Sequence, residues 1–432
     1  MTDAAARAAG PSRVTSLSVM MFLQYAVWGV WLPYLANYIT SGTEKGGLGF
    51  TPAQMGWILG LAGSIGAVSA PFLAGQIADR FLAAEKYLAL LLIGGGAVKF
   101  ATAYVHDYTT FLVMSVLYSV MYMPTLALTN SIAFAHLNSP ERQFPRVRTW
   151  GTIGWIVASN AFPLIWLQTN VKLSALPPFF VGTEKEHAVA LIGDCLRVAG
   201  VVSVLYGVWA FIFLPKTPPT RSVEHPFAFL RAFGMLAHPG FLIVTLAALP
   251  ISMIHQVYFF RMAPFLTDFL KFGQQYTGPI MSVGQFSEIA FLAILGMFLK
   301  RLGYRWTLTL GCVAYAARFA LFAAGTPETR AMVVGVNVLH GVCYAFFFAG
   351  AYVYVERISP KDIRHSAQTV FGIIILGIGP VLAGAYNQWL DTFAHGTWRT
   401  VWLVQAGIGL AAGAMVAAAF RPGFKEPEAA QS

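Results

Sequence analysis

Long apolar stretches recur along the whole chain and are separated by short polar connections. Each stretch is rich in Val, Leu, Ile, Phe, Ala and Gly, and most approach the roughly 20 residues with which a helix crosses a bilayer core. Strands of an outer-membrane barrel would be about 10 residues long with alternating polarity, which is not the pattern here. The pattern predicts twelve transmembrane helices, at residues 16–39, 54–78, 87–105, 109–135, 146–167, 197–215, 241–264, 277–299, 304–325, 331–356, 366–386 and 398–420.

The composition agrees with an all-α polytopic membrane protein. Hydrophobic residues make up 57% of the 432 residues and charged residues only 11%, which is less than half of the about 25% found in soluble domains. The first apolar stretch, from Ser16 to Ile39, is longer than the core of a cleavable signal and lacks a clean cleavage site. We therefore expect this stretch to remain as the first membrane span.

The distribution of positive charge along the chain indicates its membrane topology. The net charge is +10, and most of the 28 Lys and Arg residues fall in the two tails and in the even-numbered loops. Cytoplasmic loops of membrane proteins are enriched in Lys and Arg. This bias predicts that both termini are cytoplasmic, and it gives no reason to expect a nucleic-acid partner.

The cysteines indicate neither a disulfide framework nor a metal site. Cys195, Cys312 and Cys343 are the only three, and no CxxC or Cys/His cluster is present. Neither an HExxH motif nor a GxSxG elbow occurs, so an enzyme is poorly supported. We expect no catalytic residues, no metal and no cofactor.

Two sequence markers recur about 220 residues apart and predict a duplicated architecture. Gly75 opens a Gly-x-x-x-charge-Arg turn after the second span, and Gly296 opens the same frame after the eighth. Ser139-Pro140 follows the fourth span, and Ser359-Pro360 follows the tenth. The expected organisation is a cytoplasmic tail (1–15), a six-helix bundle (16–215), a Pro-rich basic linker (216–240), a second six-helix bundle (241–421) and a second tail (422–432). The outer loop at about 168–196 has room for a short helix.

This organisation resembles the major facilitator superfamily, whose two six-helix halves enclose a substrate site near mid-membrane. The turn formed by Gly75, Asp79 and Arg80 resembles a shortened form of the superfamily's signature after the second span. The resemblance implies that these three residues latch the alternating conformations at the cytoplasmic face. The alternative is a charged turn that only follows the topology rules.

Polar residues inside the spans are the candidates for function, because such groups are costly in lipid and usually face a partner or a watery cavity. They occur at helical spacing, so that neighbours share a face. Amides, charged groups and aromatic rings together suit a polyhydroxylated ligand that carries a flat ring. The candidates are Arg148, Thr152 and Trp155 in the fifth span, Gln256 beside His255 in the seventh, Gln285 and Glu288 in the eighth, and His340 and Tyr344 in the tenth.

Each candidate also has a simpler interpretation. Arg148 could be a flanking positive charge, and His340 a hydrogen-bonded packing residue. Arg318 in the ninth span is interpreted as structural. Lys99 and Arg261 lie close to span ends and are expected to extend toward the headgroups. Glu288 is the one acid deep in a predicted span, and a solvated face does not explain it.

Several stretches resemble the bacterial nucleoside:proton symporter family of that superfamily. They are Phe22-Leu-Gln-Tyr-Ala-Val-Trp28-Gly-Val-Trp31, Tyr122-Met-Pro-Thr-Leu-Ala-Leu-Thr-Asn130, Arg148-Thr-Trp-Gly-Thr-Ile-Gly-Trp155, Met281-Ser-Val-Gly-Gln-Phe-Ser-Glu288, Arg318-Phe-Ala-Leu-Phe-Ala and Arg364-His-Ser-Ala-Gln368. The likeness spans about 16–420. It implies that Arg148, Thr152 and Trp155 line a nucleoside site from one half, and Gln256, Gln285 and Glu288 from the other. His340 and Tyr344 stand where the family presents aromatic contacts.

The chain departs from the family at three positions. Ala345 replaces an acid tied to proton coupling, Phe259 replaces an Asn, and Trp155 replaces a Phe. With Ala345 in place of the acid, Glu288 and then His340 become the candidate proton carriers.

The resemblance implies a nucleoside transporter of the bacterial inner membrane that works by alternating access and couples transport to protons. We expect it to be a monomer. An uncoupled facilitator, a symporter for another polar molecule such as a sugar, and a non-transporting receptor are the alternatives. The receptor is disfavoured because the tails are short.

Overall fold

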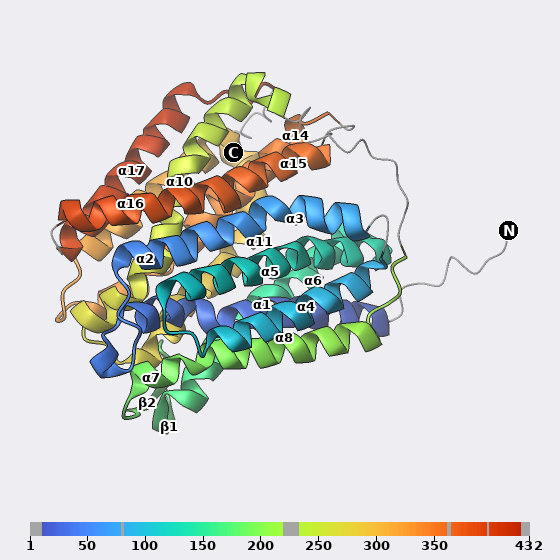
Figure 1. Ribbon diagram of the computed structural model, residues 1–432. Coiled ribbons are helices and arrows are strands. Elements are labelled where there is room, and N and C mark those ends of the chain that lie inside the picture. Colours follow the sequence, from blue (N-terminus) through green and yellow to red (C-terminus); the bar gives the residue numbers. More distant parts are fainter. Residues whose placement is uncertain (1–10, 79–81, 219–232, 361–363, 395–396, 425–432) are drawn as a thin grey trace. The chain divides into compact units, whose positions relative to one another are not determined.

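The computed structural model describes residues 11–78, 82–218, 233–360, 364–394 and 397–424, and these pack into two compact units (Figure 1). The N-terminal unit comprises the described parts of Met1–Gly49, Ile65–Gln168 and Lys185–Ser222. The C-terminal unit comprises Phe50–Ser64, Thr169–Glu184 and the described parts of Val223–Ser432.

Long helices form the N-terminal unit. Helix α4 lies against α5 and α8, and α1 lies against α6 and α8 (Figure 1). The carboxylate of Asp107 begins α5 by accepting a hydrogen bond from the Thr110 amide at 2.8 Å. Hydrogen bonds from Thr110 hold the pKa of Asp107 below its ordinary value. The helices are α1 (Pro11–Thr40), α3 (Ala62–Ala78, whose first turn belongs to the other unit), α4 (Ala84–Thr102), α5 (Tyr108–His136), α6 (Pro140–Trp166), α7 (Ala188–Ile192) and α8 (Asp194–Phe213), with the short turn η1 (Thr43–Lys45).

The C-terminal unit is also helical, and several of its helices contain π-helical turns. Helix α10 lies against α16 and α17, while α11 lies against α13 and α17. The elements are α2 (Pro52–Gly56), η2 (Trp57–Leu61), η3 (Gly234–Ala237), α10 (Pro239–Pro264), η4 (Phe265–Phe269), η5 (Gln274–Tyr276), α11 (Thr277–Ala323), α12 (Arg330–Val336), α13 (Leu339–Val342), η6 (Cys343–Ala349), α14 (Gly350–Ile358), α15 (Arg364–Ile373), η7 (Ile374–Ile378), α16 (Gly379–Ala394) and α17 (Trp398–Ala419).

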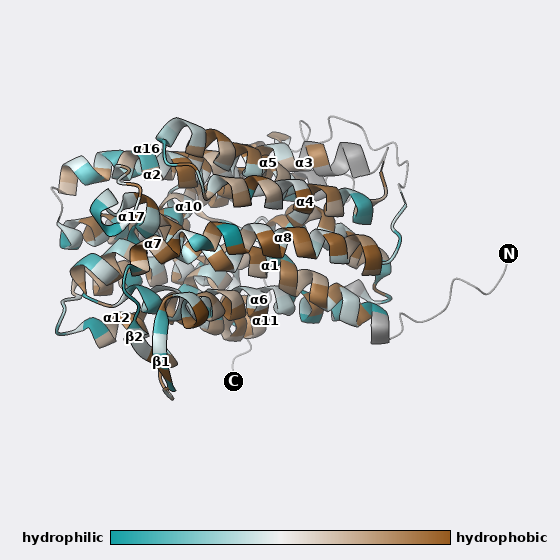
Figure 2. Cartoon of the chain, turned by 60° about the horizontal axis from the view of Figure 1, so that its bottom comes forward, coloured by the Kyte–Doolittle hydropathy of each residue, from teal (hydrophilic) through white to brown (hydrophobic). Residues whose placement is uncertain are grey.

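Each of the twelve predicted stretches falls largely within helical segments, although 87–105, 197–215 and 304–325 run two or three residues past the ends of α4, α8 and α11. Within the described residues, nine helical stretches are long and apolar enough to cross a membrane. One of these, Gln274–Ala323, corresponds to the two expected spans 277–299 and 304–325. The two spans are separated at Gly303, where φ is 74° and α11 is interrupted. Hydrophobic residues follow most of the length of helices such as α4 and α8, with hydrophilic residues near helix ends (Figure 2).

The outer loop forms a two-stranded sheet that the sequence did not predict. Strands β1 (Gln168–Leu173) and β2 (Phe180–Glu184) pair, and the expected short helix follows them as α7. In the C-terminal unit, the Gln274 amide donates to Glu184 at 2.9 Å and the Tyr276 hydroxyl donates to the Gly182 carbonyl at 3.1 Å. Burial raises the pKa of Glu184 above its ordinary value, and the bond from Gln274 partly opposes this rise.

Glycines allow α1 and α6 to approach at backbone distance. A Cβ atom at Gly154 would overlap the carbonyl oxygen of Phe22, and a Cβ atom at Gly29 would lie 2.6 Å from the carbonyl oxygen of Trp155. Small residues at helix contacts are the usual means of close packing in membranes. This contact positions the part of α6 that carries Trp155.

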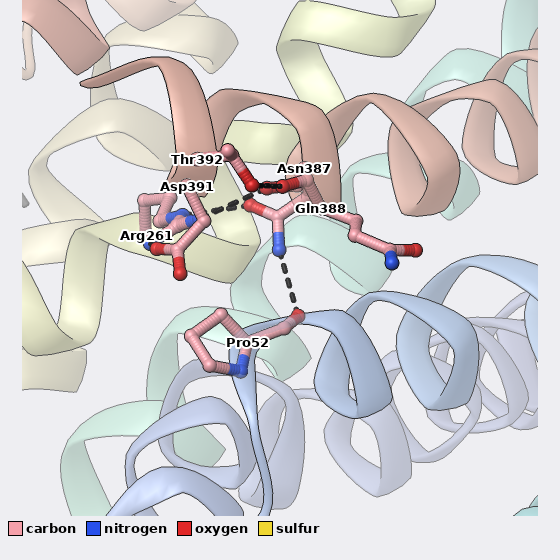
Figure 3. Close-up of polar contacts among 6 residues, drawn as sticks. All are labelled: Pro52, Arg261, Asn387, Gln388, Asp391 and Thr392. Carbon is pink, nitrogen blue, oxygen red and sulfur yellow. Dashed lines mark hydrogen bonds and ion pairs between the residues drawn. The ribbon is translucent and has the colours of Figure 1, made fainter. Parts of the chain in front are cut away.

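A buried polar cluster attaches α2 to α16 (Figure 3). Asn387 is fully buried, and its amide donates to the Pro52 carbonyl at 2.8 Å and accepts from Arg261 Nε at 2.7 Å. A second Arg261 nitrogen pairs with Asp391 at 3.0 Å. Arg261 is only 7% exposed, so the expectation that it extends toward the headgroups is wrong. Its partners on α16 hold it inside the unit.

The Asn387→Ala variant is expected to be less stable by about 1–3 kcal/mol, the cost of leaving buried polar groups without partners. Arg261 Nε and the Pro52 carbonyl would both lose the Asn387 side chain. The measurement is thermal unfolding of the purified protein in detergent. Gln388→Ala, at an exposed position one residue further along α16, is the control. Equal unfolding midpoints for the two variants would contradict the attachment.

All three cysteines are free and buried. Cys195 lies on α8, Cys312 on α11 and Cys343 at the start of η6. Each is 0% exposed.

Candidate substrate site

Helix α6 carries the three candidate residues of the N-terminal unit on one face. Thr152 and Trp155 are buried, at 9% and 6% exposure, and Arg148 is half-buried. The guanidinium of Arg148 lies over the ring of Tyr25 on α1, 4.1 Å from its centroid. This contact packs the guanidinium against an aromatic face of the same unit.

Aromatic rings continue from Tyr25 along α1 and onto α5. Tyr25 neighbours Trp28, whose ring meets Tyr122 edge-on at 6.1 Å. The Tyr122 hydroxyl donates to the Gln24 carbonyl, and the Gln24 amide donates to Thr125 at 2.7 Å. Tyr25 and Trp28 are not among the candidates from the sequence, although their i, i+3 spacing is visible there. Together they give the N-terminal unit stacking surfaces beside Arg148.

Lys99 lies deep in the same unit, which contradicts its expected extension to the headgroups. Its exposure is 3%, and its Nζ lies 3.4 Å from the Trp31 ring centroid and 4.2 Å from that of Tyr118. Both rings lie several turns inside their helices. The ammonium group is therefore held by aromatic faces within the bundle.

In the C-terminal unit, Gln285 and Glu288 lie on consecutive turns of α11. Gln285 is 8% exposed, and its Oε1 has no hydrogen-bond partner among the described residues. Glu288 is half-buried. Between them, Ser287 accepts a hydrogen bond from the Gly341 amide of α13 at 3.0 Å. This bond holds the part of α11 that carries Gln285 and Glu288 against the segment that carries His340.

A cluster of rings joins α10 to α13 and η6. The rings of His255 and His340 stack at 5.4 Å, and the Tyr344 ring lies 6.4 Å from His255. Nδ1 of His255 is 2.8 Å from the Tyr315 hydroxyl. His255 and Tyr344 are half-buried, while His340 is 2% exposed. Gln256 is half-buried next to His255, and Ala345 is fully buried where the resemblance implies an acid.

Arg318 is a member of this cluster that sequence reasoning assigned only to structure. It is fully buried on α11, with Nη1 3.0 Å from His340 Nδ1 and Nη2 3.3 Å from Asn337 Oδ1. Its guanidinium also lies 3.9 Å from the Tyr258 ring centroid. The spacing of Arg318 and His340 in the sequence gives no sign of this contact, because the two residues belong to different helices.

The eight candidates thus occupy buried or half-buried positions in two sets. Their convergence on one cavity remains a prediction. Of the latch residues, Asp79 and Arg80 lie outside the described residues, and Gly75 lies in α3. Each set offers aromatic faces and hydrogen-bonding groups of the kinds that bind a flat, polar ligand.

Comparisons with known proteins agree with this chemistry. The sequence model of the family described as Nucleoside H+ symporter matches residues 12–425. The chain is 31% identical to the xanthosine permease of Escherichia coli (strain K12) over 432 residues, and 30% identical to the nucleoside permease NupG of the same organism over 430 residues; each alignment covers 95% of both chains. The crystal structure of a point mutant of the nucleoside transporter NupG matches with a TM-score of 0.80 and 26% identity, covering 94% of this chain and 100% of that chain.

Proposed function

Because the chain belongs to the nucleoside H+ symporter family, we propose that it carries nucleosides across the cytoplasmic membrane together with protons. The fold is that of a major facilitator transporter, and the mechanism is alternating access. The family match covers both units nearly from end to end. Its relatives are permeases and transporters, which leaves no reason to look for an enzyme.

The proposal rests on the types of residue that form the two sets of candidates, one set in each unit. Each unit combines aromatic rings with strong hydrogen-bonding groups inside helices that are otherwise apolar. Arg148 beside Tyr25 represents the N-terminal unit, and Gln285 with Glu288 beside the His255–His340 rings represents the C-terminal unit. The sugar hydroxyls bind to the charged and amide groups, and the base stacks on the rings.

The proposed setting is a single chain in the bacterial inner membrane with both termini cytoplasmic. The concentration of Lys and Arg in the even-numbered loops supports this orientation. An uncoupled facilitator is the second candidate function, and buried Ala345 is the observation that favours it.

Counterflow of labelled nucleoside in proteoliposomes tests the function directly. Vesicles loaded with unlabelled uridine are expected to accumulate labelled uridine transiently, while vesicles loaded with a free sugar do not. A clear preference for the sugar would refute the nucleoside assignment. Absence of counterflow with uridine, adenosine and xanthosine would refute nucleoside transport as a whole.

The Gln285→Ala variant is expected to bind nucleoside about 5–150-fold more weakly, because the loss of one partner in a desolvated site costs about 1–3 kcal/mol. The Oε1 atom of Gln285 is buried without a partner among the described residues and is therefore available to a ligand. Equilibrium binding of labelled uridine is the measurement, and the exposed Gln388→Ala is the control. Undiminished binding would remove Gln285 from the site.

A further inference from the structure

The hydrogen bond between Arg318 and His340 reveals where the imidazole proton lies. Nη1 of Arg318 is 3.0 Å from Nδ1 of His340. A guanidinium has five N–H donors, has no acceptor and stays protonated in proteins. Nδ1 of His340 must therefore be the acceptor, so it carries no proton.

This bond determines the charge of His340 as well as its tautomer. With Nδ1 accepting, the single ring proton is on Nε2 and the imidazole is neutral. A second proton would have to occupy Nδ1, directly facing the guanidinium. His340 is 2% exposed and Arg318 is fully buried, so water screens the two like charges poorly.

Arg318 is held in place by other contacts besides His340. Its Nη2 donates to Asn337 Oδ1 at 3.3 Å, and the same oxygen accepts from the Tyr258 hydroxyl at 3.0 Å. The Asn337 amide in turn donates to the Val333 carbonyl at 3.0 Å, which sets its orientation. The Tyr258 ring lies beneath the guanidinium. These contacts fix the guanidinium of Arg318 in the position from which it bonds His340.

The surrounding elements carry other titratable groups that could influence His340. They are His255 and Tyr258 on α10, Tyr315 and Glu288 on α11, and Cys343 and Tyr344 on η6. Arg318 adds a permanent positive charge to these groups, and Glu288 is the one acid among them. Of these two, the guanidinium is bonded to Nδ1.

We propose that Arg318 is a positioning residue that keeps His340 as a neutral Nε2–H donor for a hydrogen-bond acceptor of the transported ligand. The role toward the ligand rests on the proposed nucleoside transport and on the prediction, from the family resemblance, that His340 contacts the substrate. Base carbonyls, ring nitrogens and sugar oxygens of a nucleoside are acceptors of this kind. His340 is then not a proton carrier, and Glu288 is the remaining candidate in this unit.

Nitrogen NMR of the full-length wild-type protein tests the protonation state without any transport assay. The protein is labelled with ¹⁵N-histidine in nanodiscs, and the His340 signals are identified by their loss in His340→Gln. We expect one protonated nitrogen, Nε2, and one unprotonated nitrogen, Nδ1, unchanged from pH 8 to pH 5.5. An Nδ1–H tautomer or an imidazolium signal in that range would overturn the proposal.

A pH profile of nucleoside uptake tests the positioning role. In Arg318→Met the guanidinium is absent, so His340 is free to take a proton as pH falls through the range where imidazoles ordinarily titrate. We expect a new loss of uptake of at least tenfold between pH 7 and pH 5. The double variant Arg318→Met/His340→Gln lacks this new pH dependence, and Arg318→Lys, which keeps a cationic donor, restores the wild-type profile.

The outcomes separate this proposal from the proposed function. If no nucleoside is transported but the NMR result holds, nucleoside transport fails and the protonation state stands. If wild-type uptake is normal and Arg318→Met has a wild-type pH profile, the positioning role fails and nucleoside transport stands. If Arg318→Met does not fold, the NMR titration of the wild type still tests whether His340 stays neutral with its proton on Nε2.

Discussion

The Glu288→Gln variant is expected to lose proton-driven accumulation of nucleoside while keeping nucleoside exchange. Glutamine retains the size and one acceptor of the carboxyl but cannot take up and release a proton. Glu288 is the only acidic residue of α11, and it is half-buried one turn from Gln285. A carboxyl in a partly desolvated cavity changes its proton affinity when its exposure changes, which is what coupling requires.

Glu288 is the main candidate for the proton carrier because the two alternative positions, 345 and 340, are unsuited to that role. Ala345 is buried where the family resemblance implies an acid, and His340 is hydrogen-bonded to a guanidinium. The measurement is nucleoside uptake into proteoliposomes with and without an inward proton gradient, at matched internal pH. Equal accumulation by wild type and Glu288→Gln would show that Glu288 is not the carrier. A wild type that never accumulates nucleoside would favour the uncoupled facilitator.

The Gly154→Ala variant is expected to destabilise the N-terminal unit by about 1–3 kcal/mol, the usual cost of inserting a methyl group into a closely packed contact. The added methyl would meet the Phe22 backbone of α1, which can move only if the helices separate. Because Trp155 follows directly and its carbonyl packs against Gly29, nucleoside binding is expected to weaken as well.

Thermal unfolding in detergent is the measurement, and Gly296→Ala is the matched control. A Cβ atom at Gly296 would have nothing within 4 Å, and alanine favours helix over glycine by about 1 kcal/mol. The two substitutions are thus expected to have opposite signs. A Gly154→Ala variant as stable as Gly296→Ala would contradict the close approach of α1 and α6.

The sequence predicts the helices well because hydrophobic length is a local property. Even the neighbouring spans that join as α11 were separable, since charges surround Gly303. The β1–β2 pair was missed because its strands are short and mostly exposed, and therefore leave little hydrophobic pattern. The domain boundaries, which were inferred from two sequence markers that recur about 220 residues apart, remain a prediction.

Side-chain partners were harder to predict than helices. Lys99 and Arg261 were expected at the headgroups because both lie near span ends, but Trp31 and Asn387 hold them within the units. Likewise, the link from Arg318 to His340 depends on how two helices pack, and one sequence does not carry that information. The candidate residues themselves could be found, because polar groups within apolar spans are few.

The burial of all three cysteines has a practical consequence for following the transport cycle. Thiol reagents react with an accessible thiolate, and Cys195, Cys312 and Cys343 are each 0% exposed. The native protein is therefore expected to remain largely unlabelled by a polar maleimide under conditions that preserve the fold. Pairs of cysteines introduced at exposed positions, one in each unit, such as Thr109 on α5 and Thr392 on α16, would then report spectroscopic distances without prior removal of the native thiols.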